Sequence, residues 1–195
     1  GSGGRDIAAM LADELGVHSY DKRILTLASQ YSGYPEHFFR EADETLNGSL
    51  ITKQLQALPK HHAPTGELSK FTSDDRLFDY QKIIIEKLAA SESCVIVGKC
   101  ADYILKDYDN VVSIYVEAPR SYTLRRVMER MDDITVEEAH HLITKTDKYR
   151  ADYYKYYTGG NYWTNPVNYD LTFNNARLGD ERCVKLTLDC MKLKF

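Results

Sequence analysis

The first 16 residues, GSGGRDIAAMLADELG (residues 1–16), join a glycine-rich turn directly to an amphipathic pattern. Apolar residues recur at Ile7, Met10, Leu11 and Leu15, which is the spacing of a helix that turns one face to a core. Gly16 is a typical C-terminal end signal. This stretch therefore predicts a glycine turn that opens a helix, and the rest of the chain must agree with it.

The turn itself, Gly1–Gly4, has two interpretations. A Gly-Ser leader is a common remnant of cloning and is set aside in fold analysis. Alternatively, the glycines let the backbone aim successive N–H groups at one point, and the helix that begins near Arg5 adds its positive dipole end, so the turn can hold phosphate. The immediate start of the helix favours a native loop.

Further along the chain, β-branched runs alternate with helical patterns. CVIVG (94–98) and VVSIYVEA (111–118) predict strands buried on both faces, and YDLTFNN (169–175) predicts the last strand. This alternation indicates an α/β fold, a parallel sheet between helices in three α/β/α layers. Because such a sheet usually has a strand before its first helix, we expect the first strand to precede Gly1 and to be absent from this sequence.

Helical patterns fill most of the remainder, and we expect one domain over residues 1–195. The expected helices are KRILTLASQYS ended by Gly33, segments 35–46 and 49–58, a long helix after Ser73, a short one after Lys99, PRSYTLRRVMERM (119–131), a helix from the capping box Thr135–Glu138 to about 157, and 180–193. Residues 59–72 read as a long loop.

Composition excludes several classes of protein. The net charge of −4 disfavours sequence-independent nucleic-acid binding, and no apolar run is long enough to cross a membrane. The four cysteines show no zinc-like spacing, which indicates reduced thiols in a cytoplasmic protein. Several of the 15 tyrosines crowd into residues 148–163. We interpret them as a packed amphipathic helix end, with base or sugar stacking as the alternative and a homodimer interface as a further candidate role.

Cations in the later helices are candidates for phosphate contacts. Arg126 and Arg130 are four residues apart, with Arg125 beside them, and arginine forks suit phosphate oxygens. Asp147 and Arg150 lie one turn apart and could equally be an ordinary intrahelical ion pair. Lys99 follows Gly98 where a strand gives way to a helix, although a simple turn would explain it too.

Three segments together resemble the cytidylate-kinase-like proteins, relatives of the nucleoside monophosphate kinases within the P-loop NTPases. They are residues 1–25, SCVIVGKCADYIL (93–105) and residues 147–179. The resemblance implies a P-loop NTPase-like fold with a helical acceptor-binding insertion at about 20–90 and a lid at about 125–155. It also implies an ATP- and Mg²⁺-dependent phosphotransferase whose acceptor is a small molecule, foremost a nucleoside monophosphate such as CMP.

The resemblance also implies site residues. The cofactor-binding set is Gly1, Ser2, Gly3, Gly4, Arg5, Asp6 and Arg125; the catalytic set is Arg5, Arg126, Arg130 and Arg150; and the substrate-binding set is Asp21, Lys99, Asp102 and Asp147. Residues 174–178 would lie near the nucleotide base.

The turn departs from the usual phosphate-binding loop, which ends in Gly-Lys-Ser/Thr. Here the corresponding residues are Gly4, Arg5 and Asp6. Arg5 would take the cationic role, and Asp6 would be the candidate Mg²⁺ ligand. The missing lysine and hydroxyl leave a second hypothesis, a nucleotide- or anion-binding regulatory protein with impaired catalysis.

Overall fold

The computed structural model describes residues 1–37, 39–40 and 73–195. These residues divide into two compact units: Gly1–Ser19 together with Cys94–Phe195, and Tyr20–Ser93. The predictions for residues 41–72, which include most of the two helices expected at 35–46 and 49–58 and the loop at 59–72, lie outside the described residues.

Helix α1 (Gly4–Leu15) is the helix that the opening sequence predicts. Its apolar stripe is buried at Ile7 and Leu11, and it ends at Gly16, which adopts a left-handed conformation with φ of 64°. The Gly16 N–H donates to Asp13 O and the Val17 N–H to Ala12 O, so the last carbonyls of the helix are satisfied.

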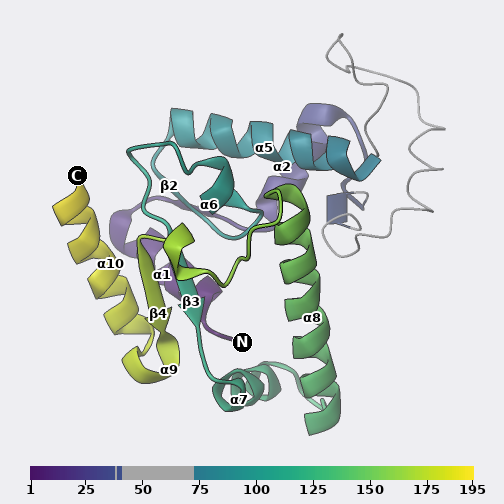
Figure 1. The fold of residues 1–195 in the computed structure, drawn as a ribbon, viewed down its shortest axis with the longest axis vertical. Helices are drawn as coiled ribbons and strands as arrows, with labels where there is room; N and C mark the ends of the chain where they lie inside the picture. The colour runs from purple at the N-terminus through teal and green to yellow at the C-terminus, as the bar shows by residue number, and fades with distance from the viewer. Residues whose placement is uncertain (38, 41–72) are drawn as a thin grey trace. The chain divides into compact units, whose positions relative to one another are not determined.

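The first unit carries two small sheets (Figure 1). Strand β1 (His18–Tyr20), which ends where the second unit begins, pairs with β2 (Cys94–Ile96). Strand β3 (Ile114–Glu117) pairs in parallel with β4 (Leu171–Asn174), with Ile114 opposite Leu171 and Glu117 opposite Asn174. The expected complete burial of the strands at 94–98 and 111–118 was wrong: their residues are half-buried or exposed, because every strand of a two-stranded sheet is an edge strand.

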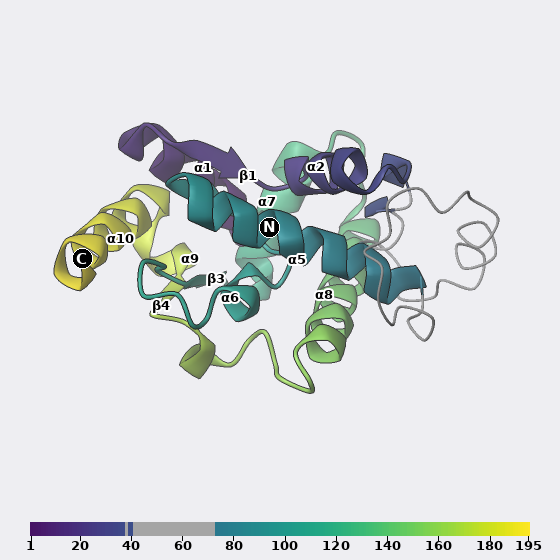
Figure 2. The ribbon, with the colours of Figure 1, turned by 90° about the horizontal axis from the view of Figure 1, so that it is seen from above.

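The core of this unit lies between α1, β3, β4 and the closing helix α10 (Asp180–Lys194). Its fully buried members are Ile7, Leu11, Phe173, Cys183 and Val184, and half-buried side chains from β2, β3 and α9 pack around them. Helix α1 contacts α10, β2 and β3, and Figure 2 shows it running beside α10. The turn ahead of α1 is thereby fixed against the ends of β3 and β4.

Helices α7 (Arg120–Arg130) and α8 (Val136–Tyr157) pack against each other. The predicted capping box is confirmed: Thr135 Oγ1 accepts from the Glu138 N–H, and Glu138 accepts from the Thr135 N–H. Tyr153 is buried, and its ring lies 4.7 Å from that of Tyr157 between centroids. This packing agrees with the structural interpretation of the tyrosine-rich segment.

Short elements link these helices and strands: α6 (Ala101–Ile104), the 3₁₀ turn η2 (Pro166–Asn168) and α9 (Asn175–Leu178). The helix expected after Lys99 is only one turn long. Lys99 and Cys100 have φ of 58° and 55°, and the Ala101 N–H donates to Gly98 O across them. Two left-handed non-glycine residues in one tight turn are strained, and such strain is often retained at functional sites.

The second unit is helical in its described part. Helix α2 (Arg23–Ser32) ends at the left-handed Gly33 as predicted, and it packs beside α5 (Ser73–Ser91). The buried ring of Tyr80 on α5 takes edge contacts from Tyr31, Tyr34 and Phe39, with ring centroids 6.0–6.4 Å apart. Aromatic packing therefore holds these helices together.

Membrane-spanning helices and disulfide bonds can be assessed for the described residues. Within residues 1–37, 39–40 and 73–195, no helix is both long and apolar enough to cross a membrane. The four cysteines, all of which lie in this part of the chain, form no disulfide bond with one another: Cys94, Cys100, Cys183 and Cys190.

Candidate functional site

The glycine turn is a built part of the fold. Gly3 has φ of 97°, and its carbonyl accepts from the Asp6 and Ile7 N–H groups as α1 begins. A Cβ on Gly3 would lie 2.3 Å from Asn175 Nδ2 and 2.9 Å from Asp180 Oδ1. Gly3 thus meets two requirements that only glycine satisfies here, a left-handed backbone and a close approach to neighbouring polar atoms.

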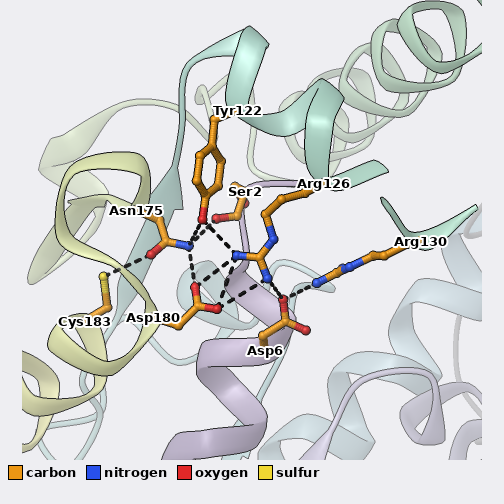
Figure 3. A network of polar contacts seen from close by, with 8 residues as sticks. All are labelled: Ser2, Asp6, Tyr122, Arg126, Arg130, Asn175, Asp180 and Cys183. Carbon is orange, nitrogen blue, oxygen red and sulfur yellow. Dashed lines mark hydrogen bonds and ion pairs between the residues drawn. The ribbon is translucent and has the colours of Figure 1, made fainter. Parts of the chain in front are cut away.

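Asn175 ties this turn to the end of β4 (Figure 3). Its side chain is 1% exposed, and Nδ2 donates to Ser2 O at 2.8 Å and to Asp180 Oδ1 at 2.6 Å. Its Oδ1 accepts from Cys183 Sγ at 3.6 Å. Both ends of the buried amide are therefore satisfied, which fixes the turn relative to α10.

Arg126 extends the network to α7. Nη1 donates to both oxygens of Asp180 at 3.2 Å and to Tyr122 Oη at 2.9 Å, and Nη2 donates to Asp6 Oδ2 at 2.5 Å. Burial opposes its charge, but the hydrogen bonds to Asp180 and Tyr122 raise the pKa of Arg126. With its side chain only 16% exposed, Arg126 is a fixed cation.

Asp6 holds a second arginine. Figure 3 shows its carboxylate between Arg126 and Arg130, and Oδ2 accepts from both. The Arg130 side chain is 46% exposed, and Asp6 is its one hydrogen-bonding partner in the described part of the chain. Arg130 therefore differs from Arg126: a ligand can reach it, and a single contact restrains it.

A third arginine, Arg150, approaches from α8. Its guanidinium lies 3.9 Å from Asp147, which lies 3.9 Å from Arg120 as well. Arg120, the first residue of α7, also donates to His140 and Thr144 and so ties the two helices together. Asp147 therefore links Arg150 to the start of α7, the helix that also carries Arg126 and Arg130.

Asp102 lies elsewhere in the first unit. Its Oδ2 accepts from Tyr154 Oη at 2.7 Å, and burial raises the pKa of its carboxyl. Asp102 lines a hollow of about 400 Å³ together with Ser113 and Asp170, which directly precede β3 and β4. The hollow is therefore at the amino ends of these strands, whereas the arginines gather at their carboxyl ends.

The other expected site residues are spread over both units. Arg5 is exposed on α1, and Arg125 is exposed on α7, where it lies 3.8 Å from Glu129. Lys99 occupies the strained turn before α6, and Asp21 belongs to the second unit. The structure thus brings Arg126 and Arg130 together with Asp6 at the glycine turn, and it links Asp147 and Arg150 to the start of α7. It does not join Asp102 to either set.

Three contributors were missed in the sequence: Asp180, Tyr122 and Arg120. Tyr122 stands four residues before Arg126, a spacing that allows contact on a helix. Asp180 gave a weaker signal, as an acid at the start of a helix that follows a strand and a short turn. Its pairing with Arg126 spans 54 residues and has no local signature.

The surroundings of Asp6 decide whether this residue can hold a divalent cation. Within the described residues, no group of three or more His, Cys, Asp or Glu side chains could hold a metal ion. Asp6 Oδ2 is engaged by two arginines, while Oδ1 accepts no hydrogen bond from the described residues. One carboxylate oxygen suits Mg²⁺, which takes one or two protein ligands and completes its shell with water and substrate phosphates. The residues therefore fit a substrate-borne Mg²⁺.

Comparison with known proteins bears on this arrangement. A sequence model described as the cytidylate kinase-like family matches residues 1–177. The chain belongs to this family. Family membership suggests a nucleotide kinase-like function for the protein. No curated protein matches the chain.

The fold has a solved counterpart. The crystal structure of an uncharacterized protein from Eubacterium ventriosum ATCC 27560 aligns with a TM-score of 0.70 and 22% sequence identity, covering 98% of this chain and 92% of that one. This likeness shows that this member of the cytidylate kinase-like family shares a mixed α/β fold with that protein.

Proposed function

We propose that the protein is an ATP- and Mg²⁺-dependent phosphotransferase acting on a small acceptor, foremost a nucleoside monophosphate such as CMP. One observation carries the proposal: at the start of a 12-residue helix, the glycine turn lies beside Arg126 and Arg130 of α7, and both arginines contact Asp6 on the first turn of that helix. Backbone N–H groups and a helix N-terminus attract anions, and arginines stabilise charge on a transferring phosphoryl group. The kinase-like family supports the same reading.

The reaction would transfer the terminal phosphoryl group of ATP to an oxygen of the acceptor phosphate. The bond from that phosphorus to the ADP oxygen breaks and a bond to the acceptor oxygen forms, leaving ADP and a nucleoside diphosphate. The turn Gly1–Gly4 and Arg5 would hold donor phosphates, and Arg126, Arg130 and Arg150 would stabilise the transferring charge. Bound Mg²⁺ would neutralise phosphate charge, with Asp6 as its protein ligand.

Acceptor binding belongs to the remaining expected residues. Asp21, Lys99 and Asp147 would contact the acceptor. Asp102 is not assigned to the acceptor, because it lines the hollow at the opposite, amino ends of β3 and β4. Arg125 would contact the donor, and residues 174–178 the nucleotide base. Asn174 Oδ1 supports a ligand there, because it is the buried side-chain atom that lacks a hydrogen-bond partner within the described residues. An orphaned buried acceptor costs about 1–3 kcal/mol and calls for an explanation, which a ligand donor would supply.

We further propose the doubly wound sheet of the P-loop NTPases as the architecture. Helix α1 contacts both β2 and β3, which belong to different two-stranded sheets. The bounds of the second unit, Tyr20–Ser93, support an acceptor-binding insertion at about 20–90, and α7 with α8 would form the lid at about 125–155. We also propose that the protein is located in the cytoplasm and that it forms a homodimer.

The second candidate function is that of a regulatory protein that binds nucleotides or other anions without transferring phosphate. Gly4, Arg5 and Asp6 stand where lysine and a hydroxyl residue are usual, and two arginines engage Asp6. A coupled assay of ADP release with Mg-ATP and a panel of monophosphates separates the two candidates. Saturable turnover with one acceptor supports the kinase, whereas tight ATP binding without turnover on any acceptor supports the binding protein.

A further inference from the structure

Asp6 and Arg130 form a contact that a bound phosphate has to change. Arg126 is held by Asp180, Tyr122 and Asp6, so it keeps its place when one partner leaves. Arg130 has only Asp6 among the described residues, and its side chain is 46% exposed. Of these two arginines, Arg130 is therefore the one that can move from the protein's own carboxylate to a ligand oxygen.

The carboxylate of Asp6 is itself an anion in the position where phosphate would pair with the arginines. A free polyphosphate that takes Arg130 exchanges one ion pair for another and also places its negative charge beside Asp6, which is unfavourable. Exposed ion pairs stabilise a protein or complex only slightly, so exchanging the Asp6–Arg130 pair for a phosphate–Arg130 pair changes the binding free energy little. The repulsion between the phosphate and Asp6 therefore decides whether free polyphosphate binds.

A polyphosphate that carries a divalent cation avoids this conflict. Asp6 Oδ1 accepts no hydrogen bond from the described residues, and a carboxylate oxygen is a ligand that Mg²⁺ prefers. One ion pair, Asp6 with Arg130, is then replaced by two attractive contacts, Arg130 with phosphate and Asp6 with the metal. The geometry points to Asp6 as the residue that makes this site select metal-bound polyphosphate over free polyphosphate.

This inference rests on the proposed phosphate site but does not require phosphoryl transfer. The experiment is isothermal titration calorimetry of inorganic tripolyphosphate, with EDTA or with saturating Mg²⁺, on the wild-type chain and on Asp6→Asn. We expect the wild type to bind the Mg²⁺ complex at least about tenfold more tightly than the free anion. Asp6→Asn should bind the free anion about threefold to tenfold more tightly than the wild type and lose most of the preference for Mg²⁺.

Asp189→Asn is the charge-matched control, because Asp189 lies on α10 and pairs with Lys192 instead of an arginine of the site. It should behave like the wild type in both titrations. Thermal unfolding checks that each variant is folded. Asp6→Ser, a second neutral replacement that keeps an oxygen, tests the same point if Asp6→Asn does not fold, and it should also bind the free anion more tightly than the wild type.

The inference is overturned if the neutral variant at position 6 binds free tripolyphosphate no better than the wild type, or if Asp189→Asn gives the same gain. Either result leaves the proposed function standing, because the wild type still binds. Failure of the wild type to bind tripolyphosphate with or without Mg²⁺ removes both the phosphate site and this inference.

Discussion

Arg126 and Asp180 join helix α7 to the start of α10: Nη1 of the arginine donates to both carboxylate oxygens at 3.2 Å. Asp180 Oδ1 also accepts from Asn175, whose amide holds the carbonyl of Ser2. The position of the glycine turn therefore depends on a carboxylate that lies far from it in the sequence.

Asp180→Asn should lower the free energy of unfolding by about 1–3 kcal/mol, because Arg126 loses a charged partner in a mostly buried position. Chemical denaturation measures the change. Asp189→Asn, at an exposed ion pair on the same helix, should stay within about 0.5 kcal/mol of the wild type. If the two variants lower the free energy of unfolding equally, the Asp180–Arg126 contact stabilises the protein no more than an exposed ion pair does, which would contradict this account.

Gly3→Ala tests whether the glycine turn is closely packed against the rest of the fold. Gly16→Ala is the matched control, since Gly16 is also left-handed but has no atom within 4 Å of an added Cβ. The control should cost about 1–2 kcal/mol for backbone strain, and Gly3→Ala about 1–3 kcal/mol more, because its Cβ meets Asn175 and Asp180. Similar melting temperatures for the two variants would contradict the close packing of the turn.

Two carboxylates of the hollow should respond to pH in opposite directions. Burial raises the pKa of Asp102 above its ordinary value of 3.8. For Asp170, burial is outweighed by hydrogen bonds from Ser113 and Lys194, which hold its pKa below 3.8. Charged Asp102 therefore opposes folding as the pH rises through its raised pKa, whereas charged Asp170 supports folding until the pH falls through its lowered pKa.

The matched variants are Asp102→Asn and Asp170→Asn. At pH 7, Asp102→Asn should be more stable than the wild type, and this gain should vanish as the pH falls below about 4. Asp170→Asn should be less stable at pH 7 by about 1 kcal/mol, a deficit that shrinks in acid. Urea unfolding at several pH values measures both, and a common sign for the two variants would contradict the assigned environments.

Local signals explain how much of this structure the sequence predicts. The helix of residues 4–15 and its end at Gly16 follow from the apolar spacing and a glycine, and the capping box Thr135–Glu138 is a short-range motif. The strands were found, but their burial was misjudged, because β-branched runs do not reveal how many neighbours a strand has.

The candidate site, too, was predictable where local spacing determines it and not where tertiary packing does. Arg126 and Arg130 were found from their helical spacing and from resemblance to a family, and the structure places both beside Asp6. Asp180 was missed because only tertiary packing brings it to Arg126. Asp102 was expected beside the acceptor, yet its partner is Tyr154, a contact across 52 residues that no local pattern announces.

Arg5→Ala tests the cation of the turn itself. Arg5 is exposed on the first turn of α1, so its removal should leave the melting temperature close to that of the wild type. ATP should bind about threefold to tenfold more weakly, as expected for the loss of one charged contact to phosphate. Arg182→Ala, at an exposed position on α10, serves as the control, and unchanged ATP affinity in Arg5→Ala would mean that Arg5 is only a surface charge.

The central claim is that the glycine turn and the arginines of α7 and α8 hold a nucleotide phosphate. A crystal structure of the protein with a non-hydrolysable ATP analogue and Mg²⁺ tests it most directly. The account predicts a phosphate group within hydrogen-bond distance of the N–H groups of residues 3–5 and of the Arg130 guanidinium, with Asp6 Oδ2 released from that arginine. A phosphate chain bound away from this turn, with Arg130 still on Asp6, would contradict it.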